Sequence, residues 1–130
     1  MADALILIVE DNPRNLKLAR DVLEFAGYRT LDARDAEEGV RLAALHLPDL
    51  ILMDVQLPGM DGDEALRLLR GSRTTRDIPV VAVTAFAMTT DRDRLLAEGF
   101  QGYLTKPISV ADFADQVGRF IPAGARETER

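Results

Sequence analysis

The feature that most constrains the fold of this chain is a regular alternation of short apolar runs with segments of helical periodicity. Residues 4–9 (ALILIV) are continuously apolar and rich in branched side chains, which is typical of a strand covered on both faces, and residues 50–53 and 79–83 follow the same pattern. Weaker strands are predicted at residues 31–33 and 103–105 from their place in the alternation. Five strands, each followed by a helix, predict an α/β fold with a five-stranded parallel sheet and helices on both faces.

The segments between the predicted strands have the spacing of amphipathic helices. Their apolar residues recur three or four positions apart, so that each segment carries one apolar stripe. Residues at the ends agree with this interpretation. Asn12 and Pro13 are typical of a helix start, and Gly27 and Gly99 of helix ends. Ser109 is predicted to cap the fifth helix.

Composition narrows the class of protein. A length of 130 residues fits one domain, and a net charge of -6 disfavours direct binding to nucleic acid. The chain has no cysteine, which excludes disulfides and thiolate metal sites. Its longest nearly apolar run, residues 80–88, is shorter than the roughly 20 residues that a membrane helix needs. We expect a cytoplasmic protein without membrane contact, with its domain at residues 1–122 and a disordered tail at residues 123–130.

Chemically functional side chains follow four of the predicted strands. Glu10 and Asp11 come after the first strand and Asp54 after the third, while Thr84 and Lys106 end the fourth and fifth. In an open parallel sheet, ligands bind beyond the carboxyl ends of the strands, so we expect these residues to share one rim. Crowded carboxylates repel one another and attract a cation, and an all-oxygen set suits Mg²⁺.

This combination of residues indicates phosphoryl chemistry. A carboxylate can act as a nucleophile and form an aspartyl phosphate, while a metal ion and a lysine neutralise the phosphoryl oxygens. The sequence contains no glycine-rich loop of the kinds that bind nucleotide phosphates. The phosphoryl donor is therefore expected to be another molecule.

Four segments of the chain resemble the receiver domains of bacterial two-component signalling. They are LILIVEDN (5–12), PDLILMDVQLPGMDG (48–62), PVVAVTAFAM (79–88) and YLTKPI (103–108). The match covers essentially residues 4–121 and is closest to single-domain receivers of the DivK type. The resemblance implies the flavodoxin-like (βα)5 receiver fold of the CheY-like superfamily, with strand order 2-1-3-4-5.

The resemblance also implies a role for each residue of the predicted rim. Asp54 matches the phosphoacceptor, and Lys106 the lysine that pairs with the phosphoryl group. Asp11 matches a direct Mg²⁺ ligand, Glu10 a neighbour that acts through water, and Gln56 a residue whose backbone carbonyl binds the metal. The pair Glu10–Asp11 departs modestly from the family, in which many members have two aspartates.

Three further positions match residues that the family uses for switching or for shaping the site. Thr84 matches the switch hydroxyl, and Tyr103 the aromatic residue that rotates inward on activation. Pro107 follows the lysine and is expected to have a cis peptide bond.

The implied function is that of a single-domain response regulator, which assists its own phosphorylation and dephosphorylation but is not an enzyme. Its expected partners are a histidine kinase or histidine phosphotransfer protein and a downstream effector protein. Phosphorylation is expected to change the face made by the fourth helix, fifth strand and fifth helix. The expected oligomeric state is a monomer or a weak phosphorylation-dependent dimer.

Simpler interpretations exist for these residues. Asp54 could form a turn after its strand, Glu10 and Asp11 could stabilise a helix N-terminus, and Tyr103 could only pack against a helix. Two other functions also remain: a phosphohydrolase working through an aspartyl phosphate, and a scaffold that is never phosphorylated. Hydrolases of the haloacid-dehalogenase type place a second acid two residues after the nucleophile, where this chain has Gln56, which cannot transfer a proton. A scaffold typically lacks the acceptor, an acid or the lysine, all of which are present here.

Overall fold

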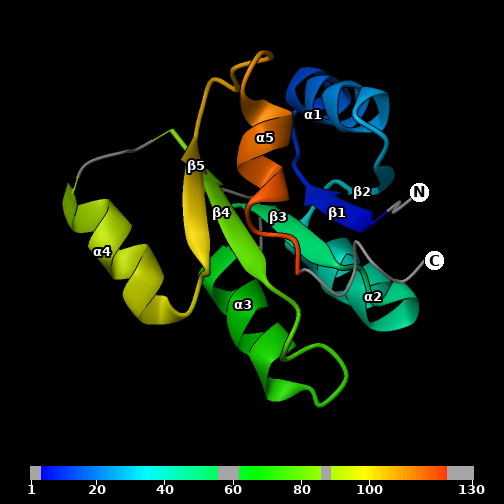
Figure 1. The fold of residues 1–130 in the computed structure, drawn as a ribbon. Coiled ribbons are helices and arrows are strands. Elements are labelled where there is room, and N and C mark those ends of the chain that lie inside the picture. The colour runs from blue at the N-terminus through cyan, green and yellow to red at the C-terminus, as the bar shows by residue number, and fades with distance from the viewer. Residues whose placement is uncertain (1–3, 56–61, 86–88, 123–130) are drawn as a thin grey trace.

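A five-stranded parallel sheet forms the centre of the molecule (Figure 1). The computed structural model describes residues 4–55, 62–85 and 89–122. The predicted tail, residues 123–130, lies outside them. The strands are β1 (Leu5–Val9), β2 (Arg29–Ala33), β3 (Leu50–Asp54), β4 (Val80–Thr84) and β5 (Gly102–Thr105). The sheet order β2-β1-β3-β4-β5 confirms the predicted fold.

Helices cover both faces of this sheet, as Figure 1 shows. Helices α1 and α5 pack against one face of the sheet, and α2 and α3 pack against the other face. None of the described helices is long and apolar enough to cross a membrane. The helices are α1 (Pro13–Phe25), α2 (Ala36–His46), α3 (Gly62–Gly71), α4 (Thr89–Glu98) and α5 (Phe113–Gly118).

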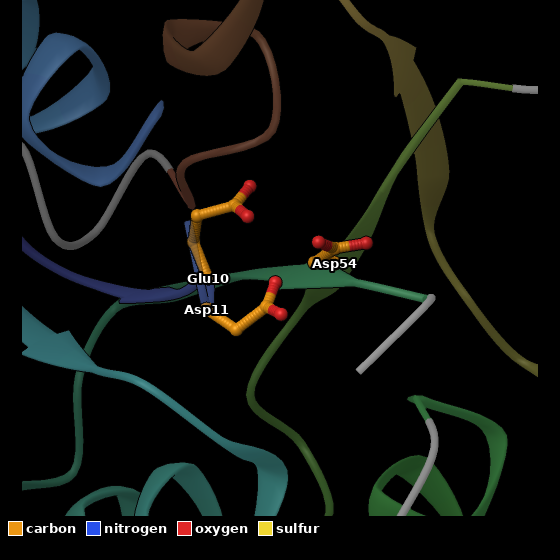
Figure 2. A group of neighbouring side chains, drawn as sticks. All are labelled: Glu10, Asp11 and Asp54. Carbon is orange, nitrogen blue, oxygen red and sulfur yellow. The ribbon is translucent and has the colours of Figure 1, made fainter. Parts of the chain in front are cut away.

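The register of the sheet brings the carboxyl ends of the strands to one edge. Val9 is aligned with Met53 across β1 and β3, and Asp54 with Val83 across β3 and β4. Glu10 and Asp11 therefore emerge beside Asp54, and Figure 2 shows the three carboxylates at this edge. The shared rim predicted from the sequence is confirmed by this alignment.

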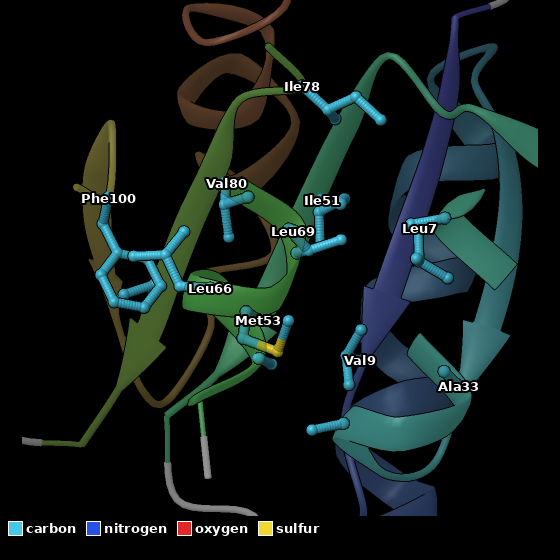
Figure 3. Packing of buried hydrophobic residues seen from close by; sticks show 14 of the residues in the cluster. Leu7, Val9, Ala33, Ile51, Met53, Leu66, Leu69, Ile78, Val80 and Phe100 are labelled. Carbon is cyan, nitrogen blue, oxygen red and sulfur yellow. The ribbon is translucent and has the colours of Figure 1, made fainter. Parts of the chain in front are cut away.

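The two faces of the sheet explain why β1 is apolar at every position. Leu7 and Val9 belong to the cluster under α2 and α3, which Figure 3 shows from close by. Ile6 and Ile8 belong to the cluster under α1 and α5. Alternate side chains point to opposite faces, so a strand buried on both sides needs an apolar residue at each position.

The start of α1 follows the sequence prediction. The Asn12 side chain accepts hydrogen bonds from the backbone N–H groups of Arg14 and Asn15, at 2.9 and 3.2 Å, and Pro13 occupies the first helical position. Gly27 has a positive φ of 102° just after α1, as expected for a residue that ends a helix.

The predicted start of the fifth helix was wrong. Helix α5 begins at Phe113 with Asp112 as its N-cap, several residues after Ser109. The backbone carbonyl of Ser109 accepts from the N–H groups of Asp112 and Phe113, at 3.1 and 2.8 Å, which forms a turn before the helix. The Ser109 hydroxyl contacts the Asp112 carboxylate instead of a helix N–H group.

Candidate functional site

Three carboxylates converge at the rim of the sheet. One carboxylate oxygen from each of Glu10, Asp11 and Asp54 lies within 4.8 Å of the other two. Glu10 and Asp54 are buried, whereas Asp11 is exposed, so the cluster is open to solvent on the side of Asp11 (Figure 2). The folded chain thus concentrates negative charge around one point that it leaves accessible.

Lys106 supplies a positive charge to the two buried members of this cluster. Its Nζ lies 2.8 Å from Asp54 Oδ2 and 2.9 Å from Glu10 Oε1. Lys106 directly follows β5. Its backbone N–H donates to the Thr84 carbonyl at 2.8 Å, which continues the β4–β5 pairing and fixes the backbone from which the side chain reaches β3 and β1. One ammonium group therefore bridges two carboxylates from distant parts of the chain.

Burial and charge shift the pKa values of this group in predictable directions. Burial raises the pKa of Glu10, and the Asp54 carboxylate adds to this, although hydrogen bonds from Lys106 and the Asn12 backbone act the other way. For Lys106, burial alone would lower the pKa, but hydrogen bonds to Asp54 and Glu10 outweigh it, and the pKa is raised. Lys106 is therefore firmly protonated.

The second oxygen of Glu10 is held by the start of α1. Glu10 Oε2 accepts a hydrogen bond from the backbone N–H of Asn12 at 3.1 Å. Asn12 thus caps α1 through its side chain and fixes Glu10 through its backbone. The sequence analysis identified the first role and missed the second, for which the only sequence signal is the position of Glu10 two residues before the cap.

Gly62 shapes the rim through the absence of a side chain. It is the first residue of α3, and a Cβ atom there would lie 2.9 Å from Val55 Cα and 3.3 Å from the Asp54 carbonyl oxygen. This role of Gly62 could not be predicted from the sequence, since only the folded chain shows how closely α3 approaches the backbone after β3.

The structure describes three of the four remaining predicted site residues. Thr84 is buried at the end of β4, and Tyr103 is half-buried in β5, packed against the cluster under α3. The peptide bond between Lys106 and Pro107 is cis. Gln56 lies outside the described residues, so its backbone carbonyl stays a sequence prediction.

The donor chemistry of the cluster fits a hard divalent cation. Its three side chains offer carboxylate oxygens only, which Mg²⁺ prefers, and no nitrogen or sulfur ligand belongs to the cluster in the described part of the chain. Mg²⁺ commonly binds through one or two carboxylates and keeps several waters, which suits the exposed side at Asp11. These residues could hold such an ion.

A comparison with protein families matches residues 6–118 to the response regulator receiver domain. The chain belongs to this family. It is also 46% identical over 116 residues to the polar-differentiation response regulator DivK of Brucella ovis. The matched region covers 89% of this chain and 94% of that protein. DivK of Brucella anthropi shows the same identity and coverage.

Solved receiver structures share the fold of this receiver. The receiver domain of a signal transduction histidine kinase from Syntrophus aciditrophicus is 38% identical, with a TM-score of 0.79 over 90% of this chain and 89% of that one. The receiver domain of a sensor histidine kinase from Pseudomonas aeruginosa is 38% identical, with a TM-score of 0.82 over 92% and 98% of the two chains. That structure has a magnesium ion coordinated in its active site cleft.

Chemotaxis protein CheY4 of Vibrio cholerae is 26% identical, with a TM-score of 0.86 over 92% of this chain and 100% of that one. This receiver is therefore a two-component signalling domain of the DivK type, with a CheY-like fold.

Proposed function

We propose that Asp54 accepts a phosphoryl group from a phosphorylated histidine on a kinase or phosphotransfer protein. A carboxylate oxygen of Asp54 attacks phosphorus, the phosphorus–nitrogen bond breaks, and the histidine nitrogen keeps its electron pair. The observation that carries this proposal is the position of Lys106, whose ammonium group lies 2.8 Å from the Asp54 carboxylate. A fixed positive charge at the nucleophile is what phosphoryl oxygens need as they approach.

The same proposal assigns the carboxylates to Mg²⁺. Asp11, Asp54 and the Gln56 carbonyl would hold the ion, with Glu10 acting through water. When bound, the ion neutralises charge on the phosphoryl oxygens. Asp11 is suited to this role because it is the exposed member of the cluster, while Glu10 is already held by Lys106 and the Asn12 backbone.

Phosphorylation would act on the fold through Thr84 and Tyr103. An aspartyl phosphate carries close to two negative charges and strong acceptor oxygens, to which the Thr84 hydroxyl can donate. The space that Thr84 leaves is then available to Tyr103, and the face made by α4, β5 and α5 changes for a downstream effector protein. This is a shift between two packings of one fold, driven by the different contacts that the phosphate makes in each. The proposed setting is the cytoplasm, and the domain signals without catalytic turnover.

Mass spectrometry after incubation with Mg²⁺ and a small phosphodonor such as acetyl phosphate tests the acceptor. We expect one phosphoryl group per chain, lost in Asp54→Asn and retained in the control Asp115→Asn, which alters an exposed aspartate of α5. Labelling of Asp54→Asn at the wild-type stoichiometry would refute the assignment.

A further inference from the structure

Basic residues are concentrated at the end of α3 and in the loop that connects it to β4. Residues 67–76 contain four arginines and no acidic residue, and the nearest acids in the sequence are Glu64 and Asp77. Of the 16 basic residues of the chain, these four leave 12 against 22 acidic residues elsewhere, so the rest of the chain has a net charge of -10. In Figure 1 this loop projects from the lower end of the molecule. Positive charge is thus gathered at one projecting place on an acidic protein.

One of the four arginines, Arg70, holds the loop in place. Its guanidinium donates to the backbone carbonyls of Arg76 and Ile78, at 3.0 and 2.7 Å. The buried hydroxyl of Thr75 donates to the Leu69 carbonyl at 2.7 Å, which ties the middle of the loop to the end of α3. A basic residue in the last turn of a helix is also favourable for the helix dipole. The fold itself therefore accounts for Arg70.

The other three arginines are exposed, and the fold does not account for them. The side chains of Arg67, Arg73 and Arg76 make no hydrogen bond or ion pair with any residue that the structure describes. The Arg76 N–H donates to the Ser72 carbonyl at 2.9 Å, and this single turn brings Arg73 and Arg76 to the same side of the loop. Arg67 lies one helical turn before Arg70, whose guanidinium contacts the Arg76 backbone. We call the side chains of Arg67, Arg73 and Arg76 the arginine surface.

The arginine surface suits carboxylates that are spaced along a chain. A guanidinium group binds a carboxylate or a phosphate through two parallel hydrogen bonds. Compact phosphate groups are typically bound by free backbone N–H groups at a helix N-terminus. Here the N–H groups of Thr75, Arg76 and Ile78 all donate within the loop, and the neighbouring helix end is a C-terminus. A nucleic acid makes many phosphate contacts and would also face the acidic remainder of the chain.

We propose that the arginine surface binds a short acidic segment of a partner protein. Each guanidinium pairs with one carboxylate of that segment. Because Arg70 and Thr75 already hold the loop, binding does not have to order its backbone. Exposed ion pairs are individually weak and are screened by salt, so the complex is weak and depends on ionic strength.

The arginine surface and the acceptor lie at opposite edges of the sheet. The loop leads into β4, whose first residue, Val80, is aligned with Ile51 of β3, three residues before Asp54. The loop therefore lies at the amino ends of the strands, whereas Asp54 lies at a carboxyl end. A partner bound to the arginine surface leaves the acceptor open to its phosphoryl donor, and the proposal does not depend on phosphorylation of Asp54.

Fluorescence anisotropy of a labelled peptide tests this surface. An octapeptide of alternating glutamate and serine, with fluorescein at its N-terminus, is titrated with the full chain at about 20 mM ionic strength, where the Debye length is about 20 Å. We expect saturable binding with a dissociation constant below about 1 mM, and at least about fivefold weaker binding for Arg73→Glu/Arg76→Glu. The matched control, Arg14→Glu/Arg34→Glu, changes the net charge equally at two exposed arginines of other segments, and it should weaken binding less than about twofold.

Further arms separate this proposal from general attraction between charges. Arg73→Gln/Arg76→Gln removes the two charges without reversing them, so its affinity should fall between those of the wild type and of the glutamate variant. Circular dichroism melts show whether each variant is folded. The proposal is overturned if the wild type does not bind the peptide, or if the Arg14/Arg34 control loses as much affinity as the Arg73/Arg76 variants. Tighter binding of a labelled single-stranded DNA of eight nucleotides than of the peptide would overturn it as well, since the partner would then be a nucleic acid.

Discussion

Replacement of Lys106 by methionine tests the electrostatic design of the site without reference to any ligand. Methionine keeps much of the apolar volume of the lysine stem but removes the charge. Glu10 and Asp54 have side chains only 7% and 4% exposed, and the Lys106 ammonium is a charged partner of both. The variant therefore leaves two buried negative charges close together.

The size of the effect follows from these distances. At an effective dielectric constant near 20, a charge pair 2.8 Å apart gains about 6 kcal/mol, and two like charges within 4.8 Å of each other lose at least about 3.5 kcal/mol. Much of this gross energy is offset by desolvation in the wild type and by water entry in the variant. Breaking a buried ion pair typically costs about 3–5 kcal/mol, and Lys106 retains 20% exposure, so we expect a loss of about 3 kcal/mol in unfolding free energy.

Urea unfolding in a buffer with a metal chelator measures this loss. Lys17→Met is the matched control, because Lys17 is an exposed lysine paired with Asp21, and it should cost less than about 1 kcal/mol. Lys106→Met should also cost at least about 1 kcal/mol less when Asp54→Asn is already present, because one of the stranded charges is then gone. If Lys106→Met costs no more than Lys17→Met, or if its cost is independent of Asp54→Asn, the reasoning is refuted.

Three further predictions concern single positions. Leu47 ends α2 with a positive φ of 48°, so Leu47→Gly should raise the free energy of unfolding by about 0.5 kcal/mol, and a melting temperature equal to or below that of the wild type would contradict this. A Cβ at Gly102 would lie 2.4 Å from the Phe120 ring, so Gly102→Ala should cost about 1–3 kcal/mol in urea unfolding, and a neutral result would show that the ring moves freely. Burial and the neighbouring Asp63 raise the pKa of Glu98, so Glu98 stabilises the fold at low pH and loses this contribution as pH rises through its folded pKa. The difference in unfolding free energy between Glu98→Gln and the wild type should therefore shift in favour of the variant as the pH rises from about 4 to about 7. Urea unfolding curves that give the same difference at both pH values would exclude the effect.

Most of the rim could be predicted from the sequence because a parallel sheet leaves little freedom there. Once residues 4–9, 50–53 and 79–83 are strands, the side chains that follow them must emerge at one edge. The strand order could not be predicted in this way, because the periodicity of a sequence does not show which strands are neighbours. The predicted order came from the resemblance to receivers.

The parts that could not be predicted depend on distances that only the folded chain sets. The bridge from Lys106 to Glu10 requires knowing how far the lysine stem reaches across two strands. Strand β2 starts two residues before the predicted range of 31–33, because Arg29 N–H bonds to the Ala4 carbonyl at 3.0 Å although Arg29 is charged. At a sheet edge, backbone pairing extends a strand without an apolar signal.

The residues of the candidate site are far apart in the sequence, which has a consequence for protein synthesis. Glu10 and Asp54 leave the ribosome well before Lys106, which follows the last strand of the sheet. A partly translated chain can hold both acids but has no cation between them. Under the proposed mechanism, a chain would become competent to receive a phosphoryl group only when β5 joins the sheet and places Lys106 between the two acids.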